Sequence, residues 1–214
     1  MNSMIDEELK RRFLYPNGTL RNKLNLQDPD ELNIVEYRTV AHNAVWLLHH
    51  GYVIKDLDDF AKIHRFLFSD IYTWAGQFRN YYLAKGGTDF MPPTAFDTAT
   101  TNINQQLKAI KVTEKPTIEQ YAQLLDSLNY LHPFREGNGR TTRLFIQLLA
   151  ANHAQYIDYN RQDSKVIDAL NQSNLVKLQE FIKITNVKSD QKSLAKAAKQ
   201  QLLDIKKVSS KNYQ

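Results

Sequence analysis

The chain has 214 residues, of which 42% are hydrophobic and 24% are charged, as in an ordinary globular domain. Its length fits one domain with a substantial core, and the absence of cysteine excludes disulfide bonds and thiolate zinc sites. The first residues lack the apolar core of a signal peptide, and no apolar run reaches membrane-spanning length. We therefore expect a cytoplasmic protein without a membrane partner.

The net charge of +5 is unevenly distributed along the chain. From Lys183 onward, eight lysines stand against Asp190 and Asp204, a balance of +6, so the preceding residues carry about −1. A lysine-rich stretch is more often a solvated helix than a binding surface, and no basic–aromatic pattern accompanies this one. We expect no nucleic-acid partner, and binding of nucleic acid or an acidic protein through the tail remains the alternative.

Helical signals dominate the order of elements. Residues 1–27 are predicted to form an arm with a short helix and a turn at Tyr15–Thr19. A long helix follows, with Asp28 as its cap and proline at its first position, and it ends at Gly51. Its helical period of apolar residues predicts an inward face of Ile34, Tyr37, Ala41, Ala44, Val45 and Leu48. Further helices are predicted from Asp56 to Trp74, from Thr94 as cap through Ile110, from Thr117 to Leu131, after the loop to Ala151, over Asp163–Asn171 and over Leu175–Ile184. The helix that leads to Leu131 is expected to carry apolar residues on its inward face: Tyr121, Leu124, Leu125, Leu128 and Leu131.

Residues 80–93 have a different character. Tyr81-Tyr82-Leu83 is β-prone, a glycine-containing turn follows, and Pro92-Pro93 ends the pattern. The stretch predicts a short β-hairpin, which needs support from the body because a lone hairpin is barely stable in water. Periodicity alone leaves open whether this hairpin lies beside residues 132–140 or is an ordinary surface connection.

The fold class that follows is mainly α, since β-prone stretches are too scarce for a doubly wound α/β sheet. We divide the chain into a body, residues 1–185, and a basic tail, residues 186–214. In the tail, apolar residues at spacings of four, four and three predict a helix: Leu194, Ala198, Leu202 and Ile205.

Residues 132–143 combine several chemically useful side chains in one helix–loop–helix. The loop ends at a helix N-terminus, where unpaired N–H groups and the helix dipole favour an anion. Glycines allow the main chain to approach a phosphate closely. The pattern predicts a phosphate site made by His132, Glu136, Gly137, Asn138, Gly139, Arg140 and Arg143.

Each residue type in this set suits one part of phosphate chemistry. Arg140 and Arg143 are three apart, so they share a helix face and can bind phosphate oxygens together. Glu136 can hold Mg²⁺, and His132 can accept a proton near neutral pH. A lone histidine or a lone Gly-Asn-Gly is usually an ordinary loop residue or turn, so the whole combination carries the prediction.

The same stretch meets every fixed position of the signature His-x-Phe-x-Asp/Glu-Gly-Asn-Gly-Arg-x-x-Arg and so resembles the Fic family. Ile71–Arg79 resembles the family segment that precedes its flap hairpin. Tyr15–Lys23 resembles the N-terminal region of the Fic toxins of toxin–antitoxin modules. The likeness covers roughly residues 10–185.

This resemblance implies a Fic fold, a helical bundle with the active loop between two core helices and one flap hairpin. It implies transfer of AMP from ATP to a Ser, Thr or Tyr hydroxyl of a target protein, with release of pyrophosphate. His132 is then the general base, and Glu136 holds Mg²⁺. The Gly137-Asn138-Gly139 backbone and Arg140 bind the phosphate chain, and Arg143 binds the γ-phosphate.

The resemblance also assigns a role to the hairpin. As a flap, residues 83–90 would align the target backbone by strand addition. Lys85, Gly86 and Gly87 are the candidate contacts there, and the resemblance also makes them candidate ATP- and phosphate-binding residues. Fic-type transfer of another phosphate-linked group is a further alternative. The phosphate-transferring Doc-type loop changes the second half of Gly-Asn-Gly, which is intact here, so AMP transfer is favoured.

Regulation is where this sequence departs from many Fic proteins. These carry an inhibitory helix, Ser/Thr-x-x-x-Glu-Gly/Asn, whose glutamate pairs with the second motif arginine. No glutamate follows Phe181, and Ser3–Glu8 has the spacing but the wrong last residue. Our hypothesis is that the protein is the toxin of a toxin–antitoxin pair and that a separate antitoxin inhibits it through Arg143.

Overall fold

The computed structural model describes residues 2–85, 87–159 and 163–187, with the backbone alone for residues 2–6 and 163. Within these residues the fold is mainly helical, as predicted. Its helices are α1 (Asn2–Phe13), α2 (Pro29–His50), α3 (Asp58–Phe68), α4 (Phe96–Val112, preceded by a 3₁₀ turn at Pro93–Ala95), α5 (Ile118–Leu131), α6 (Asn138–Asn152), α7 (Asp163–Asn171) and α8 (Leu175–Phe181).

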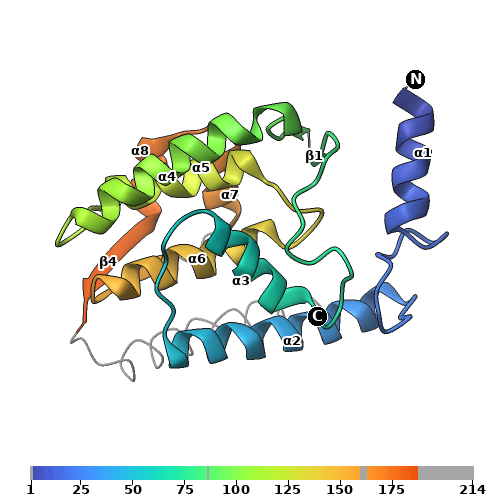
Figure 1. The fold of residues 1–214 in the computed structure, drawn as a ribbon, viewed down its shortest axis with the longest axis horizontal. Helices are drawn as coiled ribbons and strands as arrows, with labels where there is room; N and C mark the ends of the chain where they lie inside the picture. Colours follow the sequence, from blue (N-terminus) through green and yellow to red (C-terminus); the bar gives the residue numbers. More distant parts are fainter. Residues whose placement is uncertain (1, 86, 160–162, 188–214) are drawn as a thin grey trace.

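The centre of the fold is formed by α5 and α6, the two helices that flank the motif loop. In Figure 1, α6 lies between α2 on one side and α4 and α5 on the other, and it packs against α3 and α5. The apolar residues predicted to face inward on α5 are all buried, and α6 is buried along most of its length. The loop is therefore held between two core helices.

Local capping explains where two of these helices begin. The Asp28 carboxylate accepts from the N–H groups of Asp30 and Glu31 at the start of α2. Thr117 and Gln120 form a reciprocal capping box at the start of α5. Thr94 does not act as the predicted cap, because it lies inside the 3₁₀ turn and α4 begins at Phe96 without a side-chain cap.

The predicted hairpin is present but short. Strand β1 (Ala84–Lys85) pairs antiparallel with β2 (Thr88–Asp89), and Lys85 lies opposite Thr88. Phe90, only 8% exposed, follows directly, and the N–H of Met91 donates to the Tyr130 carbonyl on α5 at 3.0 Å. The hairpin is thus anchored beside the motif loop, which answers the question that periodicity left open.

A second strand pair was not predicted. Strand β3 (Gln155–Tyr159) pairs antiparallel with β4 (Ile182–Asn186), and Ile157 lies opposite Ile184. The helix expected over 175–184 therefore ends at Phe181. Short apolar runs such as these fit a buried helix and a buried strand equally well by periodicity.

Some sequence predictions fall outside the described residues. They include Gly86 and residues 188–214 of the basic tail, whose first residue, Asn186, still belongs to β4. None of the described helices is long and apolar enough to cross a bilayer.

Candidate active site

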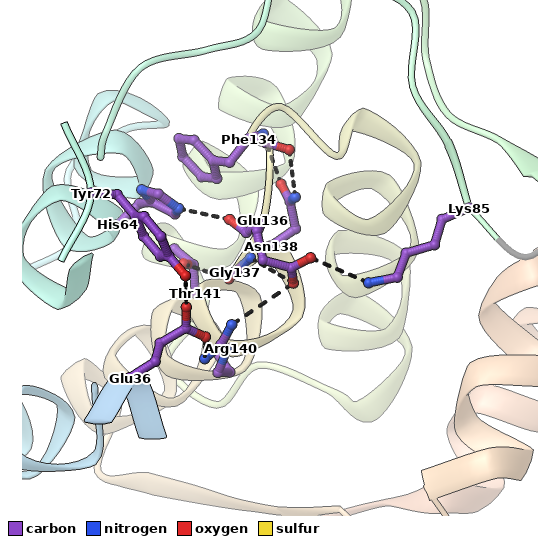
Figure 2. Close-up of polar contacts among 10 residues, drawn as sticks. All are labelled: Glu36, His64, Tyr72, Lys85, Phe134, Glu136, Gly137, Asn138, Arg140 and Thr141. Carbon is purple, nitrogen blue, oxygen red and sulfur yellow. Dashed lines mark hydrogen bonds and ion pairs between the residues drawn. The ribbon is translucent and has the colours of Figure 1, made fainter. Parts of the chain in front are cut away.

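The motif loop connects the end of α5 to the start of α6 and is fixed by Phe134. This side chain is fully buried and stacks on the imidazole of His64, with ring centroids 3.7 Å apart. The Asn138 amide holds the backbone of Phe134 from both sides, accepting its N–H at 2.9 Å and donating to its carbonyl at 2.8 Å (Figure 2). The Asn138 side chain therefore holds the loop in shape, and the backbone N–H of Asn138 at the start of α6 remains available to a ligand.

The two motif glycines differ in what requires them. Gly137 has φ of +81°, and a Cβ there would lie 2.4 Å from the Phe68 ring, so any side chain would clash. Gly139 lies exposed on the first turn of α6, and no atom of the described residues lies within 4 Å of its Cβ position. Gly137 is required by the fold, whereas Gly139 leaves open space where the helix presents its N–H groups.

Glu136 is a half-buried carboxylate among cations and donors. One oxygen accepts from the Gly137 N–H at 3.0 Å, and the other lies 3.3 Å from Nζ of Lys85 on β1 (Figure 2). A guanidinium nitrogen of Arg140 lies 3.8 Å away. Burial would raise the pKa of Glu136, but the Gly137 N–H, Lys85 and Arg140 outweigh it and hold that pKa below its usual value.

Arg140 is held by residues far away in the sequence. Its guanidinium pairs with Glu36 of α2, which is 7% exposed and also accepts from the Tyr72 hydroxyl (Figure 2). The same guanidinium lies 4.9 Å from the centroid of the Phe68 ring. Glu36 was missed by the sequence interpretation. Its spacing of four from buried Leu32 and Val40 was the available signal.

His132 lies just after α5 in a left-handed conformation, with φ of +39°. Its Nδ1 lies 3.2 Å from the Asn129 carbonyl, and its ring stacks on Phe90 with centroids 3.6 Å apart. A carbonyl only accepts, so Nδ1 carries the proton and Nε2 is the acceptor. Burial lowers the pKa of His132 to about 4, which keeps the imidazole neutral at pH 7.

The remaining predicted residues surround the same loop. Arg143 is exposed on α6 and lines a cavity together with His132, Gly139 and Tyr159. Lys85 reaches Glu136 from the hairpin, while Gly87 occupies the hairpin turn with φ of +80°. The structure thus brings these predicted side chains together, with Gly86 outside the described residues.

His64 is a second residue that sequence interpretation left without a role beyond packing. It is fully buried on α3, its Nε2 lies 3.0 Å from the Glu136 carbonyl, and its Nδ1 accepts from the Gly76 N–H at 2.8 Å. Burial lowers the pKa of His64 to about 4. A neutral imidazole therefore bridges the motif loop and the turn before the hairpin.

Comparison with known proteins identifies the family to which this chain belongs. A family model described as Fic/DOC family matches residues 55–150, which include the whole loop and hairpin. "Probable protein adenylyltransferase y4lH" of Sinorhizobium fredii is 34% identical over 161 residues, 71% of this chain and 79% of that protein. The chain belongs to the Fic/DOC family. This confirms the predicted family.

Two further matches of this Fic/DOC protein differ in what they cover. Protein adenylyltransferase VbhT of Bartonella schoenbuchensis is 35% identical over 149 residues, which are 67% of this chain but only 31% of VbhT. The N-terminal Fic domain of a VirB-translocated Bep effector from Bartonella quintana, solved with bound ADP, has a TM-score of 0.76 at 23% identity. That likeness covers 84% of this chain and 97% of the domain, and it confirms the predicted fold.

Proposed function

We propose that this protein is a protein adenylyltransferase, which transfers AMP from ATP to a Ser, Thr or Tyr hydroxyl of a target protein and releases pyrophosphate. The observation that carries the proposal is the motif loop, where neutral His132 lines one cavity with Gly139 and Arg143 at the start of α6. Relatives named as probable protein adenylyltransferases, matched over most of the chain, support the same activity.

The phosphates of ATP would bind where α6 begins. The first-turn N–H groups of Asn138 and Gly139 and the helix dipole favour negative charge there, and Gly139 offers the space. Arg143, exposed at the same cavity, would bind the γ-phosphate, and Arg140 would hold the phosphate chain. Lys85 would approach the nucleotide from the hairpin side, together with the glycine turn of the flap.

Glu136 suits a Mg²⁺ ion. It is one ionised carboxylate, and the described residues contain no cluster of three or more His, Cys, Asp or Glu that could form an all-protein metal cage. Mg²⁺ prefers such sites, with one or two carboxylates completed by phosphate oxygens and water. When bound, the ion would neutralise negative charge on the phosphates, and Lys85 would have to leave the carboxylate oxygen that it contacts.

In the reaction, the target hydroxyl oxygen attacks the α-phosphorus, the bond to pyrophosphate breaks, and the hydroxyl proton passes to Nε2 of His132. The carbonyl of Asn129 fixes the proton on Nδ1, so Nε2 faces the reaction as the acceptor. Phosphate charges nearby would raise the pKa of His132 from its low value in the free protein, which makes it a better base when ATP is bound.

The hairpin would position the target. Among the described residues, β1 and β2 pair only with each other, so their outer edges are open for another strand. Lys85 links this hairpin to Glu136, and Phe90 links it to His132. A target segment added to the edge would therefore present its hydroxyl near His132.

We also propose that a separate antitoxin inhibits the protein through Arg143. In support, no described carboxylate lies within 4 Å of this guanidinium, and no glutamate follows Phe181 in the sequence. An acidic antitoxin side chain could pair with Arg143 and exclude the γ-phosphate. Unchanged transfer of AMP in the presence of such a partner protein would count against this idea.

The activity can be tested by mass spectrometry of host proteins after expression of the wild type, His132→Ala and His49→Ala. His49 is exposed at the end of α2 and serves as the matched control. We expect hydroxyl residues carrying one AMP with the wild type and the control, and none with His132→Ala. Phosphate or another group on the same hydroxyls would point instead to a different Fic-type transfer.

A further inference from the structure

A second pocket opens between the end of α1, the segment 74–81 and the motif loop. Its lining includes two exposed or half-exposed arginines, Arg12 and Arg135, the buried Arg79, and aromatic side chains, among them Phe13, Trp74 and Tyr81. Arg135 lies in the motif between the proposed base and the proposed metal ligand, yet the chemistry proposed above gives it no role.

Positive charge gathers at this pocket. The guanidinium groups of Arg12 and Arg135 lie 4.9 and 5.7 Å from the centroid of the same Phe13 ring. Arg79 is 4% exposed, and its hydrogen bonds go to backbone carbonyls, including that of Tyr81 at 2.6 Å. Within the described part of the chain, none of these three cations forms an ion pair with a carboxylate.

Two buried donors at the pocket also lack partners. Trp74 is 7% exposed, and its Nε1 has no hydrogen-bond acceptor among the described residues. The Tyr81 hydroxyl is buried and likewise has no partner in the part of the chain that the structure describes. Burial raises the pKa of Tyr81, while Arg135, Arg79 and Arg12 act in the opposite direction, so the three cations lie near this hydroxyl. A buried donor without an acceptor is unfavourable, and a bound acceptor would remove this penalty.

These features select the chemistry of the ligand. The pocket offers N–H and O–H donors and positive charge, so it suits an anion with acceptor oxygens. Its volume of about 30 Å³ is roughly two to three times the 10–15 Å³ that a cavity needs to hold one water molecule, so only a small group fits. A flat carboxylate fits so small a space more readily than a tetrahedral phosphate, although arginine can bind either anion in bidentate geometry.

The place of the pocket indicates where the carboxylate comes from. Tyr81 lies three residues before β1, and the buried Arg79 donates to the carbonyl of His132 at 2.9 Å. A protein segment that pairs with the hairpin and offers a hydroxyl to His132 would therefore pass this pocket. We propose that the pocket binds an Asp or Glu side chain of the target protein, so that an acidic residue near the modified hydroxyl contributes to target selection. This rests on the proposed function.

Binding can be measured through Trp74, because the chain has only one other tryptophan, Trp46. Trp46 is 45% exposed on α2 and can be replaced by phenylalanine. In Trp46→Phe protein, sodium acetate at constant ionic strength should change Trp74 fluorescence saturably, and adding Arg12→Gln and Arg135→Gln should abolish the change. No saturable change, an equal change in the arginine variant, or a response to phosphate alone would overturn the proposal.

The role in target selection needs a second readout. With α-labelled ATP and a host lysate, the Arg12→Gln/Arg135→Gln variant should label target proteins about tenfold less than the wild type. Its melting temperature and its affinity for AMPPNP should be unchanged, and Arg12→Lys/Arg135→Lys should restore part of the labelling. Equal labelling by the glutamine variant would overturn target selection. Absence of labelling by the wild type would instead refute the proposed function, while the acetate titration would still report on the pocket.

Discussion

Side chains of the motif loop fall into two groups according to what they contact. Phe134 and Asn138 hold the loop, one by burial and the other by two hydrogen bonds to the backbone. His132 and Arg143 line the cavity at the start of α6, where a ligand can reach them. Substitutions of Phe134 or Asn138 should therefore lower mainly the free energy of unfolding, and substitutions of His132 or Arg143 should lower mainly the catalytic activity.

For His132, we expect the free protein to show an imidazole pKa near 4, since burial disfavours the charged form. Above that pKa the ring of the free protein is neutral. The value of kcat/KM for ATP, which reports on the free protein, should therefore not fall between pH 8 and pH 6 through protonation of His132. NMR titration of labelled histidine, with His132→Ala for assignment, measures the value. Titration near 6.5 would contradict the burial argument.

The two glycines give a matched pair of variants. Gly137→Ala places a Cβ 2.4 Å from Phe68 at a positive φ, and we expect it to destabilise the protein by roughly 2–4 kcal/mol. Gly139→Ala meets open space, so its stability should change by less than about 1 kcal/mol while ATP binding weakens. Urea unfolding and nucleotide titration distinguish the two, and equal effects on stability would contradict the account.

At the level of elements, contacts between helices complete the site. Glu36 joins α2 to Arg140 on α6, and His64 joins α3 to the carbonyl of Glu136. These partners are separated by 104 and 72 residues in the chain. Such contacts arise from tertiary packing, so no local pattern in the sequence predicts them.

Glu36→Gln tests the first of these contacts. Removing one charge of a mostly buried pair leaves Arg140 without its carboxylate, and we expect a loss of roughly 3 kcal/mol in the free energy of unfolding. KM for ATP should rise more than kcat falls, because Arg140 would lose its fixed position. Glu31→Gln, at an exposed site of the same helix, is the control. Equal stability of both variants would show that the pair is unimportant.

His64 predicts how stability depends on pH. Its pKa is about 4 when folded and about 6.5 when unfolded, so the unfolded chain binds a proton first as the pH falls. The contribution of neutral His64 to the free energy of unfolding is fully present above pH 6.5. It falls by up to about 3 kcal/mol as the pH drops from 6.5 to 4. Urea unfolding across this range should show a weaker pH dependence for His64→Gln than for the wild type, whereas His49→Gln should follow the wild type.

The sequence predicted the helices well where periodicity was long and caps were clear, as in α5. For α2 the helix, its Asp28 cap and its end were predicted, but its inward face was partly wrong: Ile34 is 53% exposed, while Glu36 and Val40 are buried. A polar residue on the buried face hides the true period. The β3–β4 pair was missed because each strand has only five residues and pairs with a distant one.

On the scale of the whole molecule, the loop is held between the two core helices α5 and α6 (Figure 1). The hairpin joins the site through contacts of Lys85 with Glu136 and of Phe90 with His132. The signature could be recognised from sequence because its fixed positions are contiguous. The surroundings of Arg140 and the pocket around Trp74 could not, because their members come from separate elements.

The most direct test of the central claim uses purified protein, a host lysate and ATP labelled at either the α- or the γ-phosphate. We predict that label appears on target proteins only from α-labelled ATP, that His132→Ala abolishes it, and that His49→Ala leaves it intact. Label transferred from the γ-position, or α-label that persists in His132→Ala, would contradict AMP transfer by this loop.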